Sequence, residues 1–176
     1  MLGPKTKKNL EEAFAGESMA RNKYDYFASA FRKAGYIQIA NIFEETALNE
    51  KAHAKIWAKQ LGLIPAELVE DLKAAAAGEH YENSEMYPRM EKEALEEGQA
   101  DIAKLFKEVG EVEEKHEARY RKLLANLEKG EVFKKPTVKR WKCNNCGYIH
   151  EGTEAPDVCP ACSHPQAYFE VFEETY

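Results

Sequence analysis

Residues 39–53 read IANIFEETALNEKAH, and residues 102–116 read IAKLFKEVGEVEEKH. The two stretches align at a shift of 63 positions, and both end in Glu-x-x-His: Glu50 with His53, and Glu113 with His116. In both, apolar residues recur every three or four positions, which is the period of an amphipathic helix. The chain therefore contains an internal repeat with a helical unit, and this repeat determines the fold.

The repeat extends upstream of these helices. Glycines separate the helical runs within each copy and predict turns there. Each copy is thus a helical hairpin with a lone Glu on its first helix, and the four runs together predict a four-helix bundle. One residue is added in the second copy, because the matching positions are Ala15-Gly16-Glu17 with Ala77-Gly78-Glu79 at a shift of 62, but Tyr24 with Tyr87 and Gly35 with Gly98 at a shift of 63.

The repeated acids lie on the apolar stripes of their helices. A single Glu in so acidic a chain is usually solvated, but a buried unpaired carboxylate costs several kcal/mol. Glu and His three positions apart share one helix face, so each Glu-x-x-His can direct an oxygen and a nitrogen to one point. Two such motifs plus a Glu from each remaining helix are typical of a site for two iron or manganese ions. The predicted ligands are Glu17, Glu50, His53, Glu79, Glu113 and His116.

Three further residues are candidates for this site. Glu82 lies three positions after Glu79 and has no acidic counterpart in the first copy. It is either a partly exposed surface acid or a seventh ligand that makes the two metals inequivalent. Tyr24 and Tyr87 contribute to the core, and a hydrogen bond from each hydroxyl to a ligating carboxylate is the favoured interpretation.

The composition changes near Gly130. We expect a helical domain over residues 1–130, a linker over 131–137, and a small domain over 138–176. A segment of that size seldom folds by apolar burial alone, so a bound metal is expected. Two Cys-x-x-Cys pairs predict four thiolate ligands, either for a structural zinc or for an iron that carries one electron. These ligands are Cys143, Cys146, Cys159 and Cys162.

Composition excludes several classes of protein. The chain has 176 residues, with 31 Asp and Glu against 25 Lys and Arg and a formal net charge of −6. This acidity argues against a nucleic-acid binder or a binder of anionic membranes. No apolar run approaches the roughly 18 residues that would span a bilayer, and the cysteines are confined to the two pairs. We therefore expect a cytoplasmic protein.

The stretch CNNCGYIHEGTEAPDVCPACSHP, residues 143–165, resembles rubredoxin. A diiron bundle followed by such a module is similar to the rubrerythrin family over nearly the whole chain, and this resemblance implies a ferritin-like four-helix bundle followed by a rubredoxin-like domain. The AGES, GEHYE and MYP segments and the two Glu-x-x-His motifs carry this resemblance together. Ser163 departs from it, because rubredoxins usually have Gly after the last Cys. If this position requires a positive φ, Ser there costs about 1 kcal/mol.

The resemblance implies an NADH-linked oxidoreductase that reduces hydrogen peroxide to water in oxidative-stress defence. Electrons would come from rubredoxin or an NADH:rubredoxin oxidoreductase, pass the iron of the four-cysteine site, and reach two iron ions in the bundle. The family also implies a homodimer. In the ligand set that the resemblance implies, Glu50 and Glu113 bridge the irons, Glu17 binds one, Glu79 and His116 bind the other, and His53 and Glu82 exchange on the first.

Two other classes of function stay open at this point. The first is a ferroxidase or iron-handling protein that uses the same site with dioxygen. The second is a non-catalytic helical module stapled by zinc. Steady-state peroxide consumption coupled to NADH oxidation would tell against the first class. Metal analysis with a visible spectrum tests the second, because a ferric tetrathiolate is red and zinc is colourless.

Overall fold

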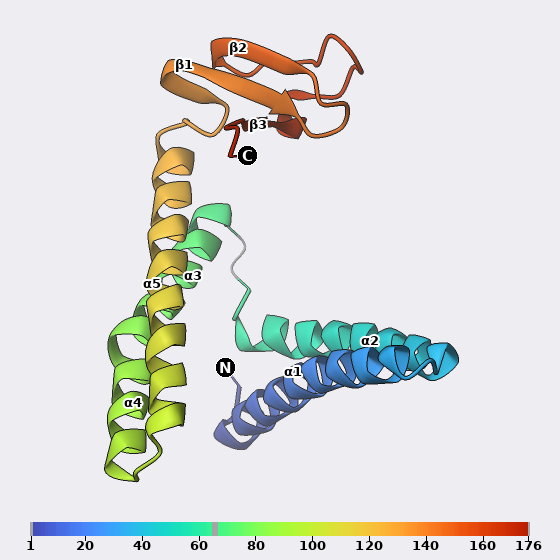
Figure 1. Ribbon diagram of the computed structural model, residues 1–176, viewed down its shortest axis with the longest axis vertical. Helices are drawn as coiled ribbons and strands as arrows, with labels where there is room; N and C mark the ends of the chain where they lie inside the picture. Colours follow the sequence, from blue (N-terminus) through green and yellow to red (C-terminus); the bar gives the residue numbers. More distant parts are fainter. Residues whose placement is uncertain (1, 65–66, 176) are drawn as a thin grey trace. The chain divides into compact units, whose positions relative to one another are not determined.

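The computed structural model describes residues 2–64 and 67–175 (Figure 1). The chain divides into two compact units at the gap between these ranges. The first unit is a helical hairpin. The second contains a further helical pair and a small β-sheet. No helix within the described ranges combines the length and the apolar character that crossing a membrane requires.

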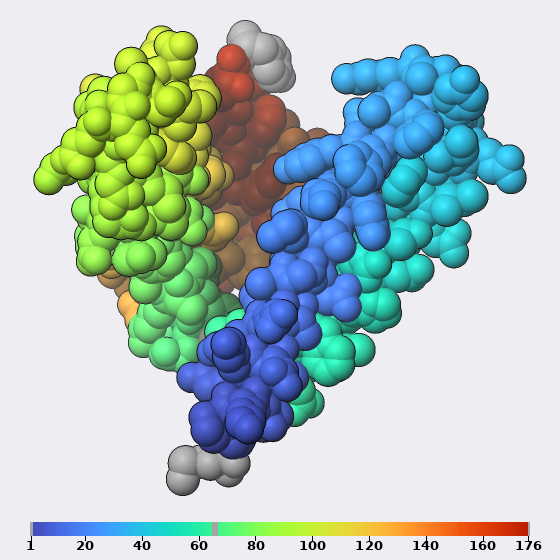
Figure 2. All heavy atoms as spheres, turned by 90° about the horizontal axis from the view of Figure 1, so that it is seen from below, coloured from blue at the N-terminus to red at the C-terminus, as the bar shows by residue number. Residues whose placement is uncertain are grey.

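The first unit consists of α1 (Pro4–Lys33) and α2 (Ile37–Leu61). Pro4 suits the first turn of α1, where a missing N–H costs nothing. The predicted turn between the helices is present, and Gly35 adopts the left-handed conformation there with φ +86°. Alanines form the buried seam, so the two helices approach closely and run side by side along their length (Figure 2). The buried residues are Ala28, Ala40, Ala47, Ala54 and Ala58.

The helical pair of the second unit has an irregular first member. This member runs from α3 (Leu68–Tyr81) through η1 (Glu82–Met86) into α4 (Tyr87–Glu96). It turns at Gly98, with φ +74°, and packs along α5 (Ala100–Glu128). The central segment, η1, is a π-helical turn.

The π-turn accounts for the extra residue of the second copy. The Tyr87 backbone N–H donates to the Glu82 carbonyl, five residues back, whereas an α-helix pairs residues four apart. A π-turn therefore contains one residue more than an α-turn. The repeat shift changes from 62 at Glu79 to 63 at Tyr87, which is the interval that contains this turn.

The C-terminal part is a three-stranded antiparallel sheet with the strand order β2-β1-β3. Its elements are β1 (Lys134–Cys143), β2 (Ile149–Glu154), the short 3-10 helix η2 (Gln166–Tyr168) and β3 (Phe169–Val171). A small core contains Trp141, Cys143, Ala155, Cys159 and Phe169.

Strand β1 begins inside the predicted linker 131–137. The Ala155 N–H bonds the Phe133 carbonyl at 2.8 Å, and Lys134 pairs with Glu154. The β1–β2 register is irregular between Lys134 and Lys139, where Pro136 lacks the N–H that a regular ladder needs. The predicted fold class is confirmed: the chain is mainly α-helical, with a small strand domain that carries four clustered cysteines.

Candidate metal centres

Three predicted ligands meet in the first unit. Glu17 comes from α1, and Glu50 and His53 come from one face of α2; their ligand atoms lie within 4.8 Å of one another. His53 Nδ1 is 2.9 Å from a Glu50 oxygen and 3.7 Å from a Glu17 oxygen. The side chains of Glu17 and Glu50 are 28% and 16% exposed. Both carboxylates are therefore partly shielded from solvent, even though the core of the hairpin consists of small residues.

The second unit contains a matching group. Glu79 of α3 meets Glu113 and His116 of α5, again within 4.8 Å. His116 Nδ1 lies 2.6 Å from a Glu113 oxygen and 3.7 Å from a Glu79 oxygen. The sequence repeat thus becomes a geometric repeat, in which each compact unit carries one set of two carboxylates and one imidazole.

The carboxylates in each group are close enough to perturb one another. A hydrogen bond between Glu17 and Glu50 raises the pKa of Glu17 and lowers the pKa of Glu50. Burial raises the pKa of Glu79, and the Glu113 carboxylate adds to the effect. A bound cation would offset the repulsion between the neighbouring carboxylates in each group. Oxygen-rich groups with one imidazole each suit iron.

Glu82 lies beside the second group without joining it. Its side chain stands on η1 and is half-buried, and its charge contributes to the raised pKa values of Glu79 and Tyr87. For Tyr87, burial is the larger cause of the raised pKa. The Glu82 carboxylate is therefore close to the Glu79 group while standing one turn further along the same helical segment.

Tyr24 and Tyr87 both pack as aromatic core residues. The Tyr24 ring lies 5.8 Å from that of Phe43, and the Tyr87 ring 6.2 Å from that of Phe106. Among the residues that the structure describes, no hydrogen bond joins either hydroxyl to a carboxylate. The predicted hydrogen bonds to ligands stay predictions, and the aromatic packing is what the geometry shows.

A polar network behind the second group was not identified from the sequence. Glu117 follows His116 on α5, and its carboxylate accepts hydrogen bonds from Asn83 at 2.8 Å and Arg121 at 2.7 Å, with His80 Nδ1 at 3.1 Å. The Asn83 bond and then the Arg121 bond lower the pKa of Glu117 to about 2. His80 of α3 is part of this network. The sequence signal for this network was that Asn83 lies between Glu79 and Tyr87, the interval in which the second copy has one extra residue.

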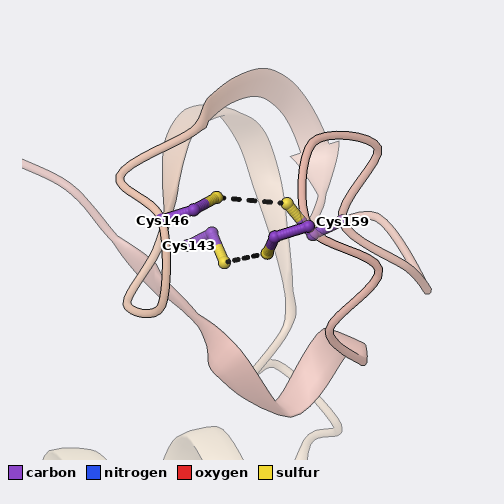
Figure 3. A group of neighbouring side chains, drawn as sticks. Cys143, Cys146 and Cys159 are labelled. Carbon is purple, nitrogen blue, oxygen red and sulfur yellow. Dashed lines mark hydrogen bonds between the residues drawn. The ribbon is translucent and has the colours of Figure 1, made fainter.

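The four cysteines converge in the C-terminal domain (Figure 3). Sγ of Cys143 lies 3.7 Å from Sγ of Cys162, and Sγ of Cys146 lies 3.7 Å from Sγ of Cys159. A metal bound to four sulfurs at about 2.3 Å in a tetrahedron separates the sulfurs by about 3.8 Å. All four are free thiols, so the geometry fits a tetrathiolate metal site.

Two backbone turns present these sulfurs. In the first, the Gly147 N–H bonds the Cys143 carbonyl; in the second, the Ser163 N–H bonds the Cys159 carbonyl. Both turns need a left-handed residue, and Ser163 takes it with φ +60°. The His164 backbone N–H lowers the pKa of the Cys162 thiol to about 6.

Comparison with known proteins agrees with this geometry. The family model described as Rubrerythrin matches residues 8–124, and the model described as Rubrerythrin, rubredoxin-like domain matches residues 141–170. A rubrerythrin of Clostridium perfringens is 51% identical, over 100% of this chain and 98% of its own length. A rubrerythrin of Nitratidesulfovibrio vulgaris is 46% identical over 97% and 96%, and a putative rubrerythrin of Methanocaldococcus jannaschii is 41% identical over 97% and 94%.

These matches decide the nature of both kinds of site. Glu and His groups belong to the diiron carboxylate centre of the helical part, and the four cysteines belong to a rubredoxin-type iron site. The predicted cofactors, two iron ions in the first and one in the second, are confirmed at the level of the family. The chain belongs to the rubrerythrin family of oxidoreductases.

Proposed function

We propose that this protein is a non-haem diiron peroxidase that reduces hydrogen peroxide to water in oxidative-stress defence. The observation that carries the proposal is the presence of two matched Glu/His groups and a tetrathiolate site in one chain. The overall reaction takes one peroxide, two electrons and two protons to two water molecules. A protein that only stores iron has no need of the tetrathiolate, whereas a peroxidase must be supplied with electrons after every turnover.

The bound irons would supply the redox chemistry: the diiron centre provides the electron pair that cleaves the O–O bond, and the tetrathiolate iron passes on single electrons. The chain's own residues hold these metals in place. Glu17, Glu50 and His53 form one half of the diiron ligand set, and Glu79, Glu113 and His116 form the other. Glu50 and Glu113 are the proposed bridging ligands, as the resemblance to rubrerythrins implies.

His53 and Glu82 are the proposed exchangeable ligands. His53 is 52% exposed against 36% for His116, so it is the less confined of the two imidazoles. Glu82 is the acid that lies beside a three-residue group without being part of it. A carboxylate stabilises ferric iron more than a neutral imidazole does, so oxidation would favour Glu82 and reduction would favour His53.

Tyr87 is a proposed hydrogen-bond donor at the site. Burial and the nearby carboxylates raise the pKa of its hydroxyl, so Tyr87 keeps its proton at neutral pH. A protonated phenol can donate to a ligating carboxylate and orient it. Tyr24 occupies the matching position in the other copy and has the same proposed role.

The proposed partners are hydrogen peroxide and an external electron donor, either rubredoxin or an NADH:rubredoxin oxidoreductase. We also propose that the protein acts as a homodimer. Sedimentation of the iron-loaded protein tests the second point directly, because a chain of 20.1 kDa and its dimer differ twofold in mass.

A coupled assay tests the activity. The full chain is loaded anaerobically with ferrous iron and mixed with NADH, an NADH:rubredoxin oxidoreductase and hydrogen peroxide. We expect NADH oxidation that depends on peroxide, with one NADH consumed per peroxide. If peroxide does not stimulate NADH oxidation, while dioxygen converts added ferrous iron to ferric mineral, the protein handles iron and the proposal is wrong.

A further inference from the structure

We propose that Asn83 and Glu117 form a clamp that holds the π-turn at Glu82–Met86, which makes both of them positioning residues for Glu82. The inference rests on the proposed function, because Glu82 is the ligand that distinguishes the two irons there. The inference adds Asn83 and Glu117, neither of which is a proposed metal ligand, and assigns both the task of positioning Glu82.

The contacts of Asn83 join two helices. Its Nδ2 donates to the Glu79 carbonyl at 2.7 Å, within its own helical segment, and to a Glu117 oxygen at 2.8 Å on α5. Glu117 is itself held by Arg121, and its side chain is only 14% exposed. A half-buried amide with two good bonds therefore ties the start of the π-turn to the helix that carries Glu113 and His116.

A π-turn needs such support because an ordinary α-turn competes with it. In the π-turn the Tyr87 N–H pairs with the Glu82 carbonyl, whereas an α-helical register would pair it with the carbonyl of residue 83. That change would rotate every later residue by about 100° around the helix axis. Tyr87 would then lose its place against α5, where its Cβ lies 3.1 Å from the position of a Cβ at Gly110.

In the internal repeat, the copy that contains the extra residue is also the copy that contains the clamp. Eight positions separate Glu79 from Tyr87, but only seven separate Glu17 from Tyr24. The first copy has a continuous α-helix at this point. Where the second copy has His80, Glu117 and Arg121, the first has Ser18, Ala54 and Ala58, so none of these three positions has an ionisable side chain in the first copy.

Ser84 provides an internal comparison. Its hydroxyl also returns to a carbonyl four residues back, that of His80, at 2.6 Å. This bond lies within the helical segment and does not reach α5. If hydrogen bonds within the helical segment alone stabilised the π-turn, removing the Ser84 or the Asn83 side chain would have the same effect. If the bond to α5 is required, removing the Asn83 side chain would have the larger effect.

The test compares Asn83→Leu with Ser84→Ala in the iron-loaded full chain. The first readout is hydrogen exchange of the backbone amides at 82–87. Loss of a buried bond to a charged group opens the turn, so we expect exchange there to rise about tenfold or more in Asn83→Leu. In Ser84→Ala we expect a change below about threefold. Equal effects in the two variants, or unchanged exchange in Asn83→Leu, would overturn the proposal.

The second readout separates positioning from metal binding. In Asn83→Leu we expect the iron content to stay at the wild-type level, while oxidation of the chemically reduced site by peroxide slows as it does in Glu82→Ala. If Glu82→Ala itself is as fast as wild type, the proposed role of Glu82 fails, but the exchange data still decide whether the clamp holds the turn. Loss of iron together with activity would assign Asn83 to metal retention and contradict the inference.

A rescue pair keeps the test valid if the leucine variant does not fold. Asn83→Asp places a carboxylate against that of Glu117, and the double variant N83D/E117Q restores an amide-to-carboxylate bond between the same two positions. We expect exchange at 82–87 to rise in the single variant and to return at least halfway to wild type in the double variant. No recovery in the double variant would contradict a clamp between these residues.

Discussion

His53 and His116 occupy matching positions in the repeat, yet their surroundings differ. Each imidazole contacts the Glu three positions earlier, but the group around His116 has a further acid, Glu82, close by. The asymmetry of the site therefore originates at single residues. Glu82 and Ser163 are the two positions where a single substitution tests how one residue adjusts a metal site.

The first prediction concerns Glu82. Replacing it with Ala should leave iron binding by the six repeated ligands intact and slow NADH-linked peroxide turnover by roughly 10- to 100-fold, the usual effect of removing a group that tunes a metal ligand set. Iron analysis and the coupled assay measure the two effects separately. Glu85→Ala, an exposed acid in the same turn, is the control and should retain wild-type turnover. Wild-type turnover in Glu82→Ala would remove Glu82 from the mechanism.

The second prediction concerns Ser163, which holds a left-handed conformation with φ +60°. Replacing it with Gly should raise the free energy of unfolding of the iron-loaded protein by about 1 kcal/mol, because Gly adopts this region without steric cost. Chemical denaturation followed by the loss of visible absorbance measures the change. Ser29→Gly on the exposed face of α1 is the control and should destabilise by about 0.5 to 1 kcal/mol. A destabilised Ser163→Gly would show that the serine side chain has a role of its own.

At the scale of elements, each helical pair packs through small residues. Alanines fill the seam of α1 and α2, while Ala76, Ala94, Ala103 and Gly110 are the buried positions of the second pair. Gly110 corresponds to Ala47 in the repeat. The loss of one methyl group at this position gives Tyr87 room after the π-turn, so the insertion in one helix is matched by a smaller residue in the other.

The third prediction follows from this close approach. A Cβ at Gly110 would lie 3.1 Å from Tyr87 Cβ, so Gly110→Ala forces the helices apart by a few tenths of an ångström. We expect it to destabilise by about 1 kcal/mol or more, although Gly→Ala in an open helix position stabilises by about 1 kcal/mol. Gly78→Ala, where the new Cβ meets nothing within 4 Å, is the control. Urea unfolding measures both variants, and equal stabilisation of the two would contradict the packing argument.

At the scale of the whole molecule, two kinds of metal site are built on two kinds of structure. Long helices place Glu and His three residues apart on one face, which suits a shared cation between helices. Tight turns between short strands bring four sulfurs within 4.8 Å of one another. The proposed one-electron transfer and the proposed two-electron reduction would therefore lie in separate parts of one chain.

The fourth prediction tests this division of labour. Cys143→Ser should abolish NADH-coupled peroxide turnover, because electrons can no longer pass through the tetrathiolate site. A chemically reduced sample should still undergo one round of oxidation by peroxide, since the Glu and His groups are unchanged. Stopped-flow spectroscopy and the coupled assay measure the two reactions, with Ser163→Gly in the same domain as the control that keeps turnover. Coupled turnover that survives Cys143→Ser would show that electrons reach the diiron site by another path.

Most of the architecture could be predicted from short-range spacing. The period of the apolar residues indicates four helices, and the structure has them with turns at the two predicted glycines. Glu50 with His53 and Glu113 with His116 come together because residues three apart share a helix face whatever the rest of the chain does. The two Cys-x-x-Cys pairs likewise predict a four-thiolate metal site from the spacing of a few residues.

The strand that starts within the predicted linker shows where such spacing stops being informative. Lys134 enters β1 because it pairs with Glu154, twenty residues away, and Pro136 only interrupts the register. The residues alone read as a linker, since Gly130 and Pro136 both disfavour regular structure there. Pairing between distant strands was needed to show where β1 begins.

By itself the sequence determined the repeat, the helices, the three ligand groups and the family. The repeat also revealed that one residue is added between Glu79 and Tyr87, but not how the helix contains it. Only the tertiary structure decided that a π-turn does so and that Asn83 reaches Glu117 across 34 positions of sequence. The physical reason is that ligand spacing is a property of a single helix, whereas a π-turn persists only where contacts from a neighbouring helix outweigh the α-turn that competes with it.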